Sequence, residues 1–199
     1  TLVSAPEILF FWVSRMIMSG LHFMGEVPYT RIYLHGTVRD TQHRKMSKSL
    51  GNGIDPMEVI ARYGADALRY SLVAGMSVGT DVILDPDDLE TSFGAGRNFA
   101  NKLWNAGRFV LSNLGSAAIR PLAGDYPDVV RREELTLEDR WIISRCNAMV
   151  IQATEAYDKY RLNEAANAVY HFLWSDFADW YIEKIKSRLY GDQPGGDVA

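Results

Sequence analysis

The feature that most constrains this chain is a long run of helical periodicity near its carboxyl end. In residues 162–190 the apolar side chains recur at spacings of three and four, which places them on one stripe of an amphipathic helix. Residues 99–110 show the same kind of pattern. Residues 116–135 are predicted to be a connection, and Thr136 is predicted to cap a helix that runs to about Tyr157. Because such stripes are buried against other helices, residues 94–190 are predicted to form an antiparallel helical bundle. The long stripe consists of Ala165, Ala166, Val169, Phe172, Leu173, Phe177, Trp180, Tyr181 and Ile185.

The amino-terminal part of the sequence contains residues that typically cap the start of a helix. Ser4 and Glu7 have the spacing of a capping box, and Pro6 lies between them, so a helix is predicted to begin here. It is expected to run to Met24 and to end at Gly25 in a left-handed cap. Apolar side chains surround it almost completely, which predicts a helix buried between two layers.

A strand and a polar loop follow this helix. Residues 29–38 contain the short apolar run that is typical of a strand covered on both faces. Residues 39–52 are polar and basic and end in glycines, so they are predicted to form a loop. A helix, a strand and a loop in this order indicate a βα remnant of an α/β domain.

A small region connects the two parts. Asp55 and Pro56 predict a helix, residues 65–74 a second one, and residues 78–84 an extended segment. Residues 85–88 predict the start of a third helix, with a break at the glycines of residues 94–96. We therefore expect a mainly α protein with four regions: residues 1–52 as the α/β end, 53–93 as a linker, 94–190 as the bundle and 191–199 as a disordered tail.

Composition excludes several classes of protein. There are 25 acidic and 21 basic side chains, so the chain is not a generally basic nucleic-acid binder. Cys146 is the single cysteine, which excludes an intrachain disulfide and indicates a reducing compartment. The most apolar stretch, residues 8–18, is too short to span a bilayer, and no histidine has carboxylate partners at metal-ligand spacing. Because the first residue already looks like mid-domain sequence, we expect a piece of a longer polypeptide.

The candidate functional residues lie in the segment 44–52, which reads RKMSKSLGN. Lys45 and Lys48 place two ammonium groups on a loop, and the serines between and after them add hydroxyl donors. Residues 39–48 hold four basic side chains and one acidic side chain, Asp40. Lysines suit phosphates whose charge changes during a reaction, because they need no fixed bidentate geometry. The sequence therefore predicts a loop that meets a phosphate chain.

The uninterrupted string Lys45–Ser49, called here the signature loop, resembles the KMSKS signature of class I aminoacyl-tRNA synthetases. It follows His35-Gly36 and precedes Gly51-Asn52 and Asp55-Pro56, in the order found in that family. The resemblance implies that residues 1–52 are the end of a Rossmann-like catalytic domain. Residues 8–17 (ILFFWVSRMI), 97–105 (RNFANKLWN), 137–142 (LEDRWI) and 163–181 resemble the valyl branch of the family.

The resemblance implies an enzyme that activates valine with ATP and Mg²⁺ and transfers it to valine tRNA, acting as a cytoplasmic monomer without a tightly bound cofactor. Lys45 and Lys48 would stabilise the charge that builds on the β- and γ-phosphates as pyrophosphate leaves. The ATP site would comprise His35, Gly36, Lys45, Met46, Ser47, Lys48 and Ser49. The pair Ile8 and Trp12 would border the valine pocket, or pack as simple core.

The resemblance is incomplete in two places. The family usually has a glycine and an aspartate near the ribose, where this sequence has Ala5 and Glu7. The sequence also has no HIGH-type motif, so the chain by itself is expected to be inactive.

The resemblance implies that residues 53–93 contact the tRNA stem and that the bundle at 94–190 binds the anticodon. A basic strip is the candidate surface, and the tryptophans at 104, 141, 174 and 180 are expected to be mostly core anchors, one or two of them free to stack on a base. Alternatives are a tRNA-binding module without catalysis, an isoleucyl or leucyl relative, and a helical interaction domain. The basic candidates are Arg97, Lys102, Arg108, Arg140 and Arg145.

Overall fold

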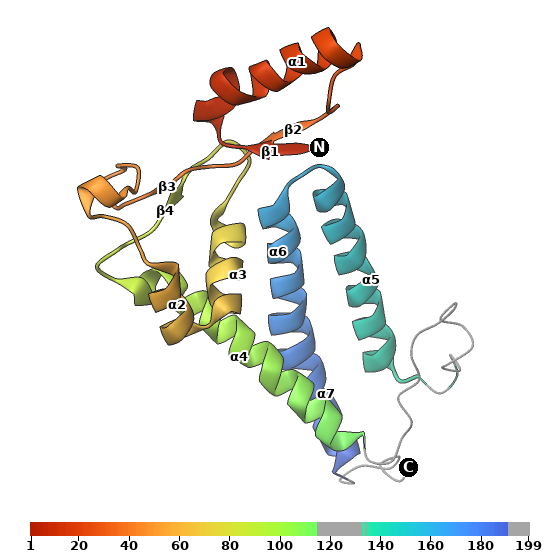
Figure 1. The fold of residues 1–199 in the computed structure, drawn as a ribbon. Helices are drawn as coiled ribbons and strands as arrows, with labels where there is room; N and C mark the ends of the chain where they lie inside the picture. Colours follow the sequence, from red (N-terminus) through yellow and green to blue (C-terminus); the bar gives the residue numbers. More distant parts are fainter. Residues whose placement is uncertain (115–132, 134, 191–199) are drawn as a thin grey trace. The chain divides into compact units, whose positions relative to one another are not determined.

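A computed structural model describes residues 1–114, 133 and 135–190. Helices dominate it, as predicted, and the strands form two short parallel pairs (Figure 1). The chain divides into two compact units. Unit 1 comprises residues 1–97 and 155–166, and unit 2 comprises residues 98–154 and 167–199.

In unit 1 the chain begins with a strand rather than a helix cap. Strand β1 (Leu2–Ser4) pairs in parallel with β2 (Ile32–Leu34), and Ser4 lies opposite Leu34. The Ser4 side chain is buried and donates to the carbonyl of Ala5 at 3.3 Å. The predicted capping box is therefore wrong, because Ser4 belongs to a strand that pairs with a segment about thirty residues away.

The following helix is less regular and more exposed than expected. It starts as a 3-10 turn, η1 (Pro6–Ile8), continues as a π-helical segment, η2 (Leu9–Val13), and becomes α1 (Ser14–Met24). Gly25 ends it with φ 76°, which confirms the predicted left-handed cap. Of all these residues only Val13 is buried. The expectation of a helix buried between layers is wrong for this chain, because within the described residues no second layer covers its outer face.

The predicted strand at 29–38 is two short strands in the structure. After β2, the chain passes Gly36 and enters β3 (Val38–Arg39), which pairs in parallel with β4 (Val82–Ile83). A Cβ atom on Gly36 would lie 1.9 Å from the carbonyl oxygen of Thr80. Only a glycine therefore lets the two segments approach this closely.

Three helices and β4 enclose the core of unit 1. Helix α2 (Pro56–Tyr63) is capped by Asp55, which accepts from the amide of Met57 at 2.8 Å, as the sequence predicted. It is followed by α3 (Ala65–Gly75) and by α4 (Leu89–Asn113). The buried core residues are Val59, Tyr63, Ala67, Val82, Leu84, Leu89 and Phe93.

Helix α4 continues through the two glycines at which a break was predicted. Gly94 and Gly96 are both buried. A Cβ atom on Gly96 would lie 2.7 Å from the carbonyl oxygen of Ala67, so this glycine serves close packing of α4 on α3. The predicted break is wrong. A glycine inside a helical sequence can either end the helix or allow another backbone to approach closely, and Gly96 does the second.

Unit 2 contains α4 from Asn98 onward, most of α5 (Leu137–Asp158) and most of a long helix in three parts. The end of α5 and the start of the long helix, within residues 155–166, belong to unit 1. The long helix consists of α6 (Leu162–His171), the π-helical segment η6 (Phe172–Tyr181) and α7 (Ile182–Leu189). Thr136 and Asp139 exchange hydrogen bonds at the start of α5, which confirms the predicted cap. Most of the predicted connection at 116–135 and the predicted tail at 191–199 lie outside the described residues.

Candidate functional site

The signature loop belongs to a segment that leaves β3 and folds back on it. Arg39 forms an isolated antiparallel bridge with Lys45, and the amide of Met46 donates to the carbonyl of Val38 at 3.2 Å. His43 turns the chain with φ 60°, an uncommon value for a residue other than glycine. The signature loop is thus anchored at its start to the edge of a strand.

Asp40 is the centre of this turn. It is 2% exposed, and its carboxylate accepts hydrogen bonds from the amides of Gln42 and Arg44 at 3.0 and 2.9 Å. It also accepts from Nε of Arg44 and from the side-chain amide of Asn52, both at 2.9 Å. These bonds, that from Asn52 first, hold the pKa of the Asp40 carboxyl well below its usual range. The carboxylate therefore remains charged and keeps its donors.

Asn52 closes the other end of the segment. It is 6% exposed, its oxygen accepts from the amide of Ser47 at 2.9 Å, and its nitrogen donates to Asp40 and, at 3.4 Å, to the carbonyl of Lys45. Neither Asp40 nor Asn52 was among the residues predicted to form the site. The available signals were a single acidic residue in a basic stretch and an asparagine directly after a loop glycine.

The end of the signature loop enters a short 3-10 helix, η3 (Lys48–Leu50). Ser47 caps it by accepting from the amide of Leu50 at 3.3 Å, and its hydroxyl lies 3.2 Å from that of Ser49. Met46, partly buried, packs against the core of unit 1. The loop is therefore held by an apolar side chain on one side and by the polar contacts of its own backbone on the other.

The two lysines have different surroundings. The Nζ atom of Lys45 lies 3.1 Å from a carboxylate oxygen of Glu7, whose other oxygen accepts from the hydroxyl of Thr37 at 3.3 Å. Lys48 is exposed, and no residue in the described part of the chain forms an ion pair with it. Glu7 thus pairs with the loop instead of capping a helix, and the Lys48 ammonium is open to an incoming anion.

Six of the seven predicted ATP-site residues line two neighbouring cavities of unit 1, and Ser49 lines neither. His35, Gly36 and Lys45 line an apolar cavity of about 490 Å³. Met46, Ser47 and Lys48 line another of about 330 Å³. Neither cavity is lined by Ile8 or Trp12, which are 45% and 57% exposed, so the described residues do not form a closed pocket around that pair.

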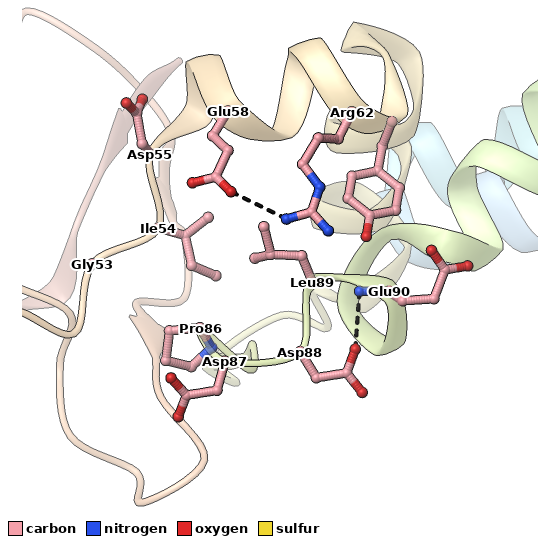
Figure 2. A pocket seen from close by; sticks show the side chains of 11 residues that line it. Gly53, Ile54, Asp55, Glu58, Arg62, Pro86, Asp87, Asp88, Leu89 and Glu90 are labelled. Atoms are coloured by element: carbon pink, nitrogen blue, oxygen red, sulfur yellow. Dashed lines mark hydrogen bonds and ion pairs between the residues drawn. The ribbon is translucent and has the colours of Figure 1, made fainter.

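A third hollow of unit 1, about 400 Å³, has an acidic lining (Figure 2). Three of its carboxylates cap helices or form an ion pair within the hollow. Asp55 caps α2, Asp88 accepts from the amides of Glu90 and Thr91 at the start of α4, and Glu58 forms an ion pair with Arg62 at 3.1 Å. No cluster of histidine, cysteine, aspartate or glutamate in the described ranges is suited to hold a metal ion.

The five basic candidates for tRNA contact do not form one free strip. Lys102 pairs with Asp179 and lies 5.1 Å from the ring of Trp174, and Arg145 pairs with Asp176 at 2.8 Å. Arg108 and Arg140 are exposed. Arg97 belongs to unit 1, where it pairs with Glu90 at 2.6 Å.

The tryptophans are more exposed than predicted. Trp104 is 74% and Trp180 is 56% exposed, so neither is a core anchor among the described residues. Trp141 contacts Trp180 with ring centres 5.6 Å apart, and Trp174 stacks on Tyr170 at 5.4 Å.

Cys146 is half-buried beside an apolar cavity of about 270 Å³ in unit 2. Across the described helices, none combines the length and apolarity that crossing a membrane requires.

Comparison with known families gives two matches. The family of "tRNA synthetases class I (I, L, M and V)" matches residues 2–85, and the "Anticodon-binding domain of tRNA ligase" matches residues 139–198.

Curated relatives match along the whole chain. The valine–tRNA ligase of Carboxydothermus hydrogenoformans is 52% identical over 198 residues, which are 100% of this chain and 21% of the relative. That of Clostridium acetobutylicum is 50% identical over 192 residues, with 96% and 20% covered, and that of Synechocystis is 48% identical over 203 residues, with 100% and 22% covered. The chain spans about one fifth of the length of these relatives.

A solved structure shares the fold. The LeuRS–tRNA–LeuAMS ternary complex from Agrobacterium radiobacter contains a chain that matches with a TM-score of 0.64 and 24% identity, covering 96% of the present chain and 27% of its own.

Proposed function

The chain belongs to the class I tRNA synthetases, in their valine–tRNA ligase family, and on this premise we propose that it supplies two working parts of such a ligase. Unit 1 supplies the loop that meets the ATP phosphates, and unit 2 supplies the surface that binds the tRNA. The observation that carries the proposal is identity near 50% to valine–tRNA ligases over the whole chain, with the signature string intact. The leucyl neighbour, at 24% identity, is more distant, which favours the valine branch.

The proposed chemistry of unit 1 is electrostatic. Valine attacks the α-phosphate of Mg²⁺-bound ATP, and negative charge grows on the β- and γ-phosphates as pyrophosphate leaves. Lys48 is exposed and Lys45 needs only to exchange an exposed glutamate for a phosphate, so both ammonium groups can reach that charge. His35 and Gly36, which line the cavity beside Lys45, would adjoin the adenosine, and the remaining loop residues, Met46, Ser47 and Ser49, would complete the ATP site.

The finer architecture forms part of the same proposal. The two parallel strand pairs would be the end of a Rossmann-like catalytic fold in residues 1–52. Residues 53–93 would form the region that contacts the tRNA stem, and residues 94–190 an antiparallel anticodon-binding bundle. Ile8 and Trp12 would border the valine pocket once the rest of the ligase covers them. The whole ligase would act as a cytoplasmic monomer.

The tRNA surface is proposed for unit 2 because the anticodon-binding match covers 139–198 and because the leucyl neighbour was solved with tRNA. Arg108 and Arg140 are exposed and form no ion pair within the described residues, and Trp104 offers an exposed ring for stacking. Lys102, Arg145 and Arg97 would have to leave their carboxylate partners to contact phosphate.

A segment exchange tests the catalytic half of the proposal. This chain would replace the matching 198 residues of the Carboxydothermus hydrogenoformans ligase, giving what we call the chimeric ligase. We expect it to catalyse valine-dependent ATP–pyrophosphate exchange, and Lys48→Ala to reduce the rate by about 10²-fold, the usual loss when one transition-state donor is removed. Lys159→Ala, which removes an exposed lysine paired with Glu155, is the matched control. Equal rates for the two variants would contradict the proposal.

A binding titration tests the tRNA half. We expect the chain itself to bind valine tRNA more tightly than an anticodon-substituted valine tRNA, with affinity that falls as salt rises. The chain alone is expected to show no ATP–pyrophosphate exchange, because its sequence lacks the HIGH-type motif. Equal affinity for both tRNAs would argue against anticodon recognition by unit 2.

A further inference from the structure

Two buried polar side chains in unit 1 have no part in the chemistry proposed so far. Asp40 and Asn52 are 2% and 6% exposed, although both residue types usually lie at the surface. They flank the signature loop, one before it and one after it, and their side chains join at 2.9 Å. The contact therefore closes a loop of the chain around the five residues of the signature.

The Asn52 amide fixes the loop at two backbone points. Its oxygen accepts from the amide of Ser47 and its nitrogen donates toward the carbonyl of Lys45, on either side of Met46. The same nitrogen donates to Asp40, which holds the preceding turn through the amides of Gln42 and Arg44. One side chain thus links the path of the loop to the path of the turn that leads into it.

These contacts fix the backbone of an exposed segment rather than support a core. The residues at 48–51 are exposed, and η3 contains no buried residue. An ammonium group that is already oriented stabilises a transition state more than a mobile one, because the entropy of ordering it is lost before the reaction begins.

We propose that Asn52 and Asp40 are positioning residues, which hold the signature loop in the conformation that presents its lysines to the triphosphate. This inference rests on the proposed function. Asn52 acts through the backbone at Lys45 and Ser47, and Asp40 acts through Asn52. Neither side chain touches the substrate.

The test compares Asn52→Ala, Asn52→Asp and the exchanged pair Asp40→Asn with Asn52→Asp in the chimeric ligase. Asn52→Asp puts two carboxylates in contact, whereas the exchanged pair restores one donor between them. We expect each single variant to lower kcat for ATP–pyrophosphate exchange by about 10²-fold with the KM for valine unchanged, since small displacements of catalytic groups have effects of this size. The exchanged pair is expected to recover about tenfold over Asn52→Asp. Gln42→Ala, whose exposed side chain lies in the same turn, is the control and should match the unsubstituted chimera.

A second measurement on the chain itself needs no activity. Asn52→Ala should speed hydrogen exchange of the Ser47 amide by about tenfold, because that amide loses its acceptor. Unchanged exchange at Ser47, or single variants as fast as Gln42→Ala in an active chimera, would overturn this inference alone. An inactive unsubstituted chimera would overturn the proposed function as well.

Discussion

The buried carboxylate of unit 2 gives a prediction that can be worked out from its contacts. Asp139 is 8% exposed and receives two hydrogen bonds on each oxygen. One oxygen accepts from Arg188 at 2.6 Å and from the hydroxyl of Tyr181 at 2.9 Å. The other accepts from Arg188 at 2.9 Å and from the amide of Thr136 at 3.0 Å. The site joins the first turn of α5 to η6 and α7.

Asp139→Asn replaces one of these oxygens by a donor, so two existing donors lose their acceptor whichever way the amide turns. Hydrogen bonds to a charged group contribute about 1.5–3 kcal/mol each. Because the Arg188 side chain is 33% exposed, water replaces part of the loss. We therefore expect the free energy of unfolding to fall by about 2–3 kcal/mol, below the 3–5 kcal/mol typical of a fully buried pair.

Urea unfolding followed by tryptophan fluorescence measures this change. Four of the five tryptophans lie in unit 2, and Trp141 and Trp180 are in contact, so the signal reports the unit that contains Asp139. A loss of about 2–3 kcal/mol moves the midpoint down by about 1–2 M urea. Asp179→Asn is the matched control, since its exposed ion pair with Lys102 contributes less than about 1 kcal/mol. A midpoint for Asp139→Asn equal to that of Asp179→Asn would refute the reasoning.

Three further outcomes are expected. The difference in free energy of unfolding between the unsubstituted chain and Asp139→Asn should be largest at pH 7 and should shrink as the pH falls below about 4 in urea titrations. The reason is that folding lowers the pKa of the Asp139 carboxyl from 3.8, so its protonation at low pH removes the contribution. A difference that stays constant down to pH 2 would contradict this. Gly36→Ala should disrupt the β3–β4 pairing, seen as faster amide hydrogen exchange there, whereas Gly53→Ala, with open space around it, should leave exchange unchanged; equal effects would disprove the close-approach argument. Trp104→Ala should change the stability of unit 2 by less than about 0.5 kcal/mol, because the side chain is 74% exposed, and a loss above 1 kcal/mol would show unrecognised packing.

Local chemistry made several parts of this fold predictable. The start of α2 follows from Asp55 and Pro56, and the start of α5 follows from Thr136. In each case the residues that decide the structure lie within one helical turn of each other. Gly25 ends α1 for the same kind of reason.

Contacts between distant residues explain what the sequence did not reveal. Ser4 has the spacing of a cap, yet the pairing of β1 with β2 decides its conformation. Gly96 looks like a helix breaker until the backbone of Ala67 is seen against it. The same holds for the candidate site. The signature string identified the two lysines, but the Asp40–Asn52 contact joins residues twelve positions apart. The local signals of these two residues do not show that their side chains meet.

The π-helical segment η6 has a consequence for how this helix tolerates changes in length. Phe172 and Phe177 stack with ring centres 6.4 Å apart, a contact between residues five apart that suits the wider π turn. A π turn corresponds to an α-helix that holds an additional residue, so removing one residue here would let the helix tighten and continue. Elsewhere in the helix a deletion would turn every following side chain away from its partners. In related sequences, single-residue length variation in this helix is therefore expected to fall within Phe172–Tyr181, at the expense of the aromatic stack.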